Sequence, residues 1–316
     1  MTSSSSGFVR LAVTAGIAVS CSIALYWYLT QDEDKQQQQQ QQQKQQSITS
    51  TDTATTTTTL EVPVVELKSF FNRDSLPDIY AEECKKVASA LHHYGVVILR
   101  DPRVEEKHND CFLDMMENYF GGSDGVRDAR PAYGYQVGVT KDLVELPRNH
   151  CAVAGSMGPN NKPLSPCPPE LDPKWRFFWR TGPRPAKTDF PSENMDAVIP
   201  PEFPEWKQVM DMWGGQMTDA LFTVAEMAAV GFGMAPDTFT SRMLYGPHLL
   251  APTGSDFQVY GTEGTVLAGF HYDLNFLTIH GKSRFPGLYI WTRDGTRTAV
   301  AIPDGCLLVQ VSPLQR

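Results

Sequence analysis

The hydrophobic and polar pattern of the chain changes twice along its length. An uncharged run covers residues 11–29 and is followed by a polar stretch rich in glutamine and threonine. Helical spacing of apolar side chains then dominates as far as residue 232, and short segments of period two follow residue 245. The pattern predicts three parts, which are residues 1–30, residues 31–59 and a folded region over residues 60–316.

The first part of the folded region, residues 60–244, is expected to be mainly helical. Three segments place apolar side chains at helical spacing; in the first, Ile79, Val87, Ala90 and Leu91 form the apolar face. The segments are residues 78–93, 104–120 and 206–232. We expect a break in the third at Gly214 and Gly215, a buried strand at residues 96–99, and a long irregular excursion over the Pro- and Gly-rich residues 155–204.

The second part, residues 245–316, predicts antiparallel strands. Five segments alternate in the manner of strands, and Asp294 and Gly295 form a hairpin turn between two of them. The segments are residues 265–270, 274–279, 287–292, 298–302 and 307–311. Helices followed by short strands predict an α+β fold, in which a helical N-terminal scaffold packs on a β-sandwich or jelly roll.

The uncharged run over residues 11–29 has the length of a membrane-spanning helix. As a helix it measures about 28 Å, close to the hydrocarbon thickness of a bilayer. Arg10 precedes it and acidic residues follow, which favours a single-pass anchor with a cytosolic N-terminus. A cleaved signal peptide and an organelle-targeting segment remain alternatives. Residues 31–59 lack the apolar surface needed to fold and are expected to be a disordered tether.

Charge and cysteine content narrow the function classes. The net charge is −9 and no Lys/Arg-rich run is present, which argues against nucleic acid as a partner. The six cysteines form no C-x-x-C spacing, so neither a structural zinc site nor a redox motif is indicated. Scattered thiols suit a reducing compartment, an expectation in tension with a domain placed in a lumen.

One short motif carries candidate chemistry. His271 and Asp273 stand two residues apart, so on a strand both side chains would point to the same face. An imidazole and a carboxylate supply two ligands of the 2-His-1-carboxylate site that binds Fe(II) and leaves positions open for a co-substrate and oxygen. An isolated H-x-D is a weak signal, because chance surface pairs and hydrogen-bonded His–Asp pairs share the spacing.

The neighbourhood of this motif resembles the isopenicillin N synthase-like family of Fe(II)/2-oxoglutarate-dependent dioxygenases. The shared order is H-x-D at His271 and Asp273, then Leu277-Thr278, Gly287-Leu288 and Asp294-Gly295. The resemblance implies a double-stranded β-helix (jelly-roll) core, His271 and Asp273 as iron ligands, and molecular oxygen as a reactant. It also implies 2-oxoglutarate as the usual co-substrate, which is converted to succinate while a C–H bond is oxidised.

Two features depart from the family pattern. Leu244 and Gly246 stand where an Asn and a Tyr are expected, so no co-substrate ligand is carried over. The family's distal histidine and its carboxylate-binding Arg follow the H-x-D by more residues than remain here, which predicts a core that is incomplete at the C-terminus and has exposed strand edges. His280 would lie about 30 Å along an extended strand and on the opposite face. His150 and His248 could contribute only by tertiary routes that sequence does not reveal.

The sequence therefore predicts a membrane-tethered oxidoreductase that uses Fe(II) and 2-oxoglutarate to oxidise a small organic substrate. The chain could be inactive because the third ligand is missing. The main alternative is a non-catalytic binding or regulatory homologue, and a zinc hydrolase is weaker because it also needs a third ligand. The organic substrate and the oligomeric state cannot be read from the sequence.

Overall fold

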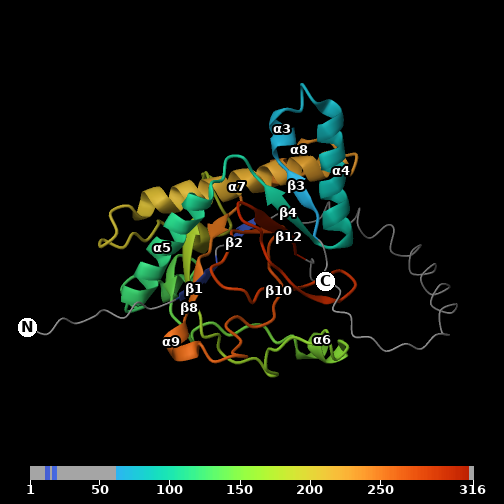
Figure 1. Cartoon of the computed structure of the whole chain (residues 1–316). Coiled ribbons are helices and arrows are strands. Elements are labelled where there is room, and N and C mark those ends of the chain that lie inside the picture. Colours follow the sequence, from blue (N-terminus) through green and yellow to red (C-terminus); the bar gives the residue numbers. More distant parts are fainter. Residues whose placement is uncertain (1–10, 15, 20–61, 313–316) are drawn as a thin grey trace, which may run out of the picture.

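The computed structural model describes residues 11–14, 16–19 and 62–312. These residues form a mixed α+β structure, in which helices cover one side of a large sheet (Figure 1). The strands are β1 Leu11–Thr14, β2 Gly16–Val19, β3 Val64–Glu66, β4 Val96–Arg100, β5 Gly138–Thr140, β6 Trp175–Arg180, β7 Leu249–Leu250, β8 Thr253–Asp256, β9 Leu277–His280, β10 Tyr289–Trp291, β11 Arg297–Ala299 and β12 Leu307–Val311. The helices are α3 Lys68–Phe71, α4 Pro77–His93, α5 Glu106–Gly122, α6 Cys151–Ser156, α7 Trp206–Gly231, α8 Asp237–Met243 and α9 Phe257–Tyr260.

The main sheet combines strands from distant parts of the chain. Its order is β1-β8-β6-β7-β2-β9-β12-β4-β3, and β5 pairs with β6 at its side. The described pairs are antiparallel except for β3 and β4, which run parallel. β10 and β11 form a separate hairpin. Few neighbours in the sheet are consecutive in sequence, so long-range pairing determines the register.

The helical layer is built around α7. In Figure 1 α7 crosses one side of the molecule with α4 and α5 beside it, and the segment with α6 lies on the opposite side. Trp206, Trp213 and Met217 of α7 are fully buried in the main core. A Cβ on Gly231 would lie 2.1 Å from the carbonyl oxygen of Cys84 in α4, so only glycine permits this close crossing.

The three predicted helices are confirmed, with one difference of detail. α7 continues through Gly214 and Gly215, where the sequence predicts a break. A Cβ on Gly214 would lie 2.4 Å from the Thr181 Cγ2, so this glycine serves close packing of the helix on β6 rather than a turn. Ile79, expected on the apolar face of the first helix, is 53% exposed.

Four of the five predicted C-terminal strands are found, and residues 265–270 form none. β12 begins and ends at the predicted residues, and the predicted turn joins β10 to β11. The Thr292 hydroxyl donates to Asp294 Oδ1, and the Gly295 amide donates to the Thr292 carbonyl, which closes that turn.

The N-terminal apolar run differs from its prediction. Where the sequence predicts a membrane-spanning helix over residues 11–29, β1 and β2 are strands of the main sheet. β2 pairs with β7 on one side and with β9 on the other, because an apolar extended segment satisfies its backbone groups in the middle of a sheet. Among the described helices, none is long and apolar enough to cross a bilayer. Residues 15, 20–29 and the expected tether over residues 31–59 lie outside the described residues.

The last strand, β12, carries no exposed edge. β12 lies between β9 and β4, so its backbone groups are paired on both sides. The other side of β9 is paired with β2. β2, from the N-terminal end of the chain, thus lies beside β9, where the sequence predicts no neighbouring strand. The part of the sheet that carries Thr278 and Gln310 is therefore continuous.

Candidate functional site

The segment that carries the H-x-D motif is irregular. Residues 269–273 have no strand assignment, and the chain bends at residues 274–276 before β9 begins. His271 and Asp273 therefore do not lie on a strand, the setting in which their spacing would by itself place both side chains on one face. The two side chains nevertheless converge, with His271 Nε2 3.4 Å from Asp273 Oδ1.

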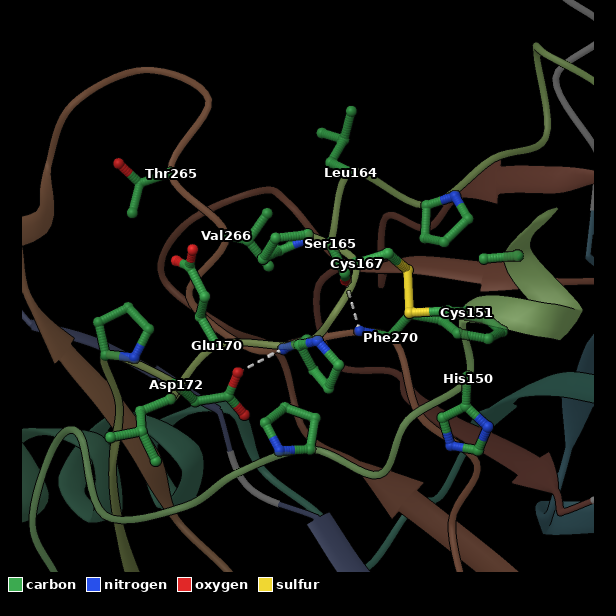
Figure 2. A pocket seen from close by; sticks show the side chains of 18 of the residues that line it. His150, Cys151, Leu164, Ser165, Cys167, Glu170, Asp172, Thr265, Val266 and Phe270 are labelled. Atoms are coloured by element: carbon green, nitrogen blue, oxygen red, sulfur yellow. Dashed lines mark hydrogen bonds between the residues drawn. A yellow bond between two sulfur atoms is a disulfide. The ribbon is translucent and has the colours of Figure 1, made fainter.

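Because no strand pairing fixes this segment, side-chain contacts from an earlier loop hold it. The Gly269 amide donates to Asp172 Oδ1 at 2.8 Å, and the Phe270 amide donates to the Ser165 hydroxyl oxygen at 2.6 Å (Figure 2). A Cβ on Gly269 would lie 2.8 Å from Pro147 Cγ, so glycine is needed where the two segments meet. Lys174 Nζ lies 2.7 Å from Asp172 Oδ2, which fixes that carboxylate from its other side. The H-x-D segment is thus held by groups about one hundred residues earlier in the chain.

A disulfide closes the loop that supplies these contacts. Cys151 and Cys167 are bonded, with their Cα atoms 5.6 Å apart (Figure 2). This pairing corrects the expectation of free, scattered thiols, because folding of the loop brings together two cysteines that are 16 residues apart in sequence. A cavity of about 460 Å³ lies between this loop and residues 264–270.

His271 is oriented by its own backbone. Its Nδ1 lies 2.7 Å from the carbonyl oxygen of Gly269, so Nδ1 carries the proton that is donated to this oxygen. In the neutral ring this arrangement leaves the lone pair on Nε2, the atom that faces Asp273. A backbone carbonyl that fixes the tautomer is the usual support of a metal-binding histidine.

Asp273 is held on its other oxygen. Asp273 Oδ2 accepts hydrogen bonds from the Thr278 hydroxyl at 2.5 Å and from Gln310 Nε2 at 2.6 Å. Thr278 of β9 and Gln310 of β12 are direct partners in the sheet register, so their side chains lie on the same face. The sheet therefore orients the carboxylate, and Oδ1 remains turned toward His271.

The pKa values of the pair move apart. The hydrogen bond to Asp273 raises the pKa of His271, although burial opposes this shift. Burial by itself would raise the pKa of Asp273, but hydrogen bonds from His271 and Thr278 and the nearby imidazolium charge lower it well below its usual range. Asp273 is consequently a carboxylate at any ordinary pH, which is the form that binds a metal.

Both side chains face a large cavity. It has a volume of about 930 Å³, and aromatic rings form much of its lining. The His271 side chain is 49% exposed, and that of Asp273 is 19% exposed. The cavity is within the size range of small-molecule sites in proteins. A ligand in it would have direct access to His271.

The structure locates the three other candidate histidines differently from one another. His280 lines the same cavity as His271, which corrects the expected separation of about 30 Å, because the bend at residues 274–276 folds the chain back. Its Nε2 is buried without a hydrogen-bond partner, and burial lowers its pKa. The His150 ring packs edge-on against Tyr272 at 5.2 Å. His248 is 1% exposed, packs against Phe222 and is not part of this cavity.

Within the described ranges no group of three or more His, Cys, Asp or Glu side chains is placed to hold a metal ion. His271 and Asp273 fit Fe(II) in donor chemistry and in proximity, whereas the described residues do not supply a third ligand. The structure thus brings the two side chains together, and their role as metal ligands stays a prediction.

Several supporting residues are absent from the sequence prediction. Thr278 belongs to the Leu-Thr pair of the family pattern and Gln310 lies in a predicted strand, so the alternation of side chains in these two strands was a usable signal. Ser165 and Asp172 lie in a Pro-rich segment that gives no local sign of a partner at residues 269–270. These two could be found only from the tertiary structure.

Comparison with solved structures identifies the fold. A 2OG-Fe(II) oxygenase family protein of Caulobacter crescentus aligns with a TM-score of 0.57 and 18% identity over 80% of this chain and 74% of that protein. A full-length Neurospora crassa protein, solved in complex with alpha-KG and thymine, aligns with a TM-score of 0.60 and 16% identity over 83% of this chain and 77% of that protein. JOX2, in complex with 2OG, Fe and JA, aligns with a TM-score of 0.51 and 14% identity over 86% of this chain and 72% of that protein.

No protein-family profile matches the sequence, and no curated protein sequence matches it. At identities below 20% the structural likeness establishes the fold and leaves the activity to be argued from the site. The chain therefore has the fold of the 2-oxoglutarate- and Fe(II)-dependent oxygenases.

Proposed function

We propose that the chain is an oxidoreductase that uses Fe(II) and 2-oxoglutarate to oxidise a C–H bond of a small organic substrate. We assign this activity to residues 60–316 and equate the main sheet, which β1 and β2 complete, with the double-stranded β-helix of the isopenicillin N synthase-like family. The observation that carries the proposal is the convergence of His271 Nε2 and Asp273 Oδ1, 3.4 Å apart at a large cavity. Structural neighbours that contain alpha-KG, or 2OG and Fe, support it.

In this proposal His271 and Asp273 hold the iron. The Gly269 carbonyl fixes the proton of His271 on Nδ1 and leaves Nε2 free to bind, while Thr278 and Gln310 hold the far oxygen of Asp273. Bound Fe(II) supplies a centre at which oxygen and the co-substrate react. Aromatic side chains in the cavity lining offer an apolar surface near the two ligands.

A second candidate is a non-catalytic binding protein of the same fold. The observation that favours it is the absence, within the described residues, of a group of three metal-binding side chains. Two protein ligands bind iron more weakly than three, so occupancy of the site distinguishes the candidates. A zinc hydrolase gains no support, because it also requires three protein ligands.

The deciding experiment combines metal analysis with product detection. We expect the full chain to bind one Fe(II) per molecule at sufficient iron concentration and to release succinate from 2-oxoglutarate in the presence of oxygen. His271→Ala should abolish both. His280→Ala is the matched control, because it removes a histidine from the same cavity without removing an assigned ligand. Stoichiometric iron in His271→Ala would refute the ligand assignment, and iron binding without succinate would favour the binding protein.

A further inference from the structure

The lining of the large cavity differs in charge from the rest of the chain. The chain as a whole has a net charge of −9. Among the described residues that line the cavity, however, three permanent cations face a single carboxylate, that of Asp273. The cations are Lys174, Arg293 and Arg297. A cavity with this balance favours an anionic ligand.

The three cations are not equivalent. Lys174 Nζ lies 2.7 Å from Asp172 Oδ2 and 3.3 Å from Glu145 Oε2, so two carboxylates neutralise it. Arg293 donates from Nη1 to the carbonyl oxygen of His92. Arg297 forms no ion pair with any carboxylate of the described residues, and its Nη1 donates to the carbonyl oxygen of Lys162 at 2.9 Å. The Nε and Nη2 groups of Arg297 thus form the cationic edge that is available to a ligand.

Arg297 lines the same cavity as the two candidate metal ligands, and contacts through Trp291 and Phe270 connect it to their segment. Arg297 is the register partner of Trp291 in the β10–β11 hairpin, so the two side chains lie on the same face. The Trp291 ring packs against Phe270 at 4.6 Å between centroids, and Phe270 directly precedes His271. The guanidinium carbon of Arg297 lies 5.2 Å from the centroid of the Tyr289 ring.

The loop around residue 161 fixes Arg297 and Trp291 together. Trp291 Nε1 donates to the carbonyl oxygen of Asn161 at 2.6 Å, and the Arg297 amide donates to Asn161 Oδ1 at 3.1 Å. An arginine held in this way loses little side-chain entropy when it binds a ligand, and its planar fork matches a carboxylate. Aromatic rings beside it favour a flat, apolar molecular body.

From these contacts we propose that the cavity binds the carboxylate group of a flat, apolar organic acid through Arg297, with Trp291 and Tyr289 against the body of the acid. As a statement about the substrate this inference rests on the proposed function, whereas as a statement about binding it does not require iron. 2-Oxoglutarate also presents carboxylates but lacks a flat, apolar body, so the experiment separates binding of the organic acid from binding of the co-substrate.

The test measures binding by isothermal titration calorimetry on the full chain with a chelator present, so that iron takes no part. The probes are trans-cinnamate, its neutral isostere cinnamamide, and 2-oxoglutarate. We expect trans-cinnamate to bind at least about tenfold more tightly than cinnamamide, as one charge-assisted hydrogen bond would give. Arg297→Gln should remove this preference, and Arg297→Lys should keep part of it.

Arg242→Gln is the matched control, because Arg242 is an exposed arginine of α8 whose Nη1 also bonds one backbone carbonyl, that of Thr238. It should bind the probes as the unchanged chain does. Equal thermal stability of Arg297→Gln and the unchanged chain would exclude misfolding as the cause of lost binding. Loss of 2-oxoglutarate binding alone in Arg297→Gln would overturn the proposal, because 2-oxoglutarate is a flexible dicarboxylate without a flat, apolar body. Loss of trans-cinnamate binding alone would support the proposal, with the organic substrate as the acid that is bound.

Three further outcomes would overturn the proposal. The first is equal affinity of the unchanged chain for trans-cinnamate and cinnamamide, and the second is binding of neither trans-cinnamate nor 2-oxoglutarate. The third is an Arg297→Gln variant that binds both acids normally. Normal binding of trans-cinnamate by Arg297→Gln, together with succinate release by the unchanged chain, would refute this inference and leave the proposed function intact. Arg297-dependent binding of trans-cinnamate in a chain that never releases succinate would support this inference and refute the proposed oxidoreductase activity.

Discussion

The helical layer and the segment that carries His271 and Asp273 are held by different kinds of interaction. α4, α5 and α7 bury apolar side chains that recur at helical spacing, so neighbouring residues cooperate in forming each helix. Residues 269–273 form neither helix nor strand and depend on Asp172, Ser165 and a disulfide-closed loop. The difference shows that stability and site geometry depend on separate parts of the chain. Substitutions in the helical layer should therefore mainly lower stability, and substitutions around residues 269–273 should mainly weaken metal binding.

The largest effect is expected in the helical layer. Trp213 of α7 is fully buried, and its ring stacks on Phe112 with 5.9 Å between centroids. Trp213→Ala should lower the free energy of unfolding by about 3–5 kcal/mol, because it removes a large side chain from a close-packed core. Denaturant unfolding measures this loss. The control is Ile79→Ala on the exposed face of α4, for which a loss above about 1 kcal/mol would contradict the described burial.

The next effect concerns the loop that holds the H-x-D segment. Replacing Cys151 and Cys167 by serine opens a loop of 16 residues and should cost about 3 kcal/mol of stability. Unlike Trp213→Ala, this change should also weaken Fe(II) binding under conditions in which the protein remains folded. Cys111→Ser, which replaces an exposed free cysteine, is the control. Unchanged iron affinity in the double variant would show that the loop does not support the site.

Stability should fall in mild acid through a histidine outside the site. Burial, together with the nearby Arg180, lowers the pKa of His248 to about 4. In the unfolded chain His248 takes up a proton as the pH falls below about 6.5, whereas the folded chain resists this until about pH 4. The neutral state of His248 therefore contributes fully to stability above pH 6.5. At pH 5 the free energy of unfolding is lower by about 2 kcal/mol than at neutral pH.

Comparison of unfolding free energies at pH 7 and pH 5 measures the effect of His248. His248→Gln should lose less stability between these pH values than the unchanged chain does. His93→Gln, on the exposed end of α4, should behave like the unchanged chain. Identical pH dependence in His248→Gln and the unchanged chain would contradict the buried, neutral state of His248.

The smallest effect is expected at the support of Asp273. Gln310→Leu removes one of the two hydrogen bonds to Asp273 Oδ2 while β12 remains paired on both sides. Fe(II) affinity should fall about tenfold, as is typical when a partner of a metal ligand is lost, with little change in unfolding. Metal titration measures this, and Gln208→Leu on the exposed face of α7 is the control. A large loss of stability in Gln310→Leu would instead show that Gln310 stabilises the fold, as the buried residues of the helical layer do.

Prediction from the sequence succeeded where the signal was local. The apolar spacing of α4, α5 and α7 and the alternation of β12 predicted these elements closely. The H-x-D spacing predicted that the side chains of His271 and Asp273 converge, and their role as metal ligands stays a prediction. The break at Gly214 and Gly215 was wrong, because a glycine that breaks an isolated helix can also permit close packing on β6. The membrane helix over residues 11–29 was wrong in its described stretches, because the same apolar residues suit the middle of a sheet.

By itself the sequence determined the α+β class, the main helices and the two candidate metal ligands, since each depends on side chains only a few positions apart. Only the tertiary structure decided that β2 fills the place between β7 and β9, that Ser165 and Asp172 hold the H-x-D segment, and that Arg297 lies at the cavity. These features join residues about one hundred or more positions apart or depend on a chain reversal. The physical reason is that such contacts are chosen by the energy of the whole packed structure, which no local pattern records.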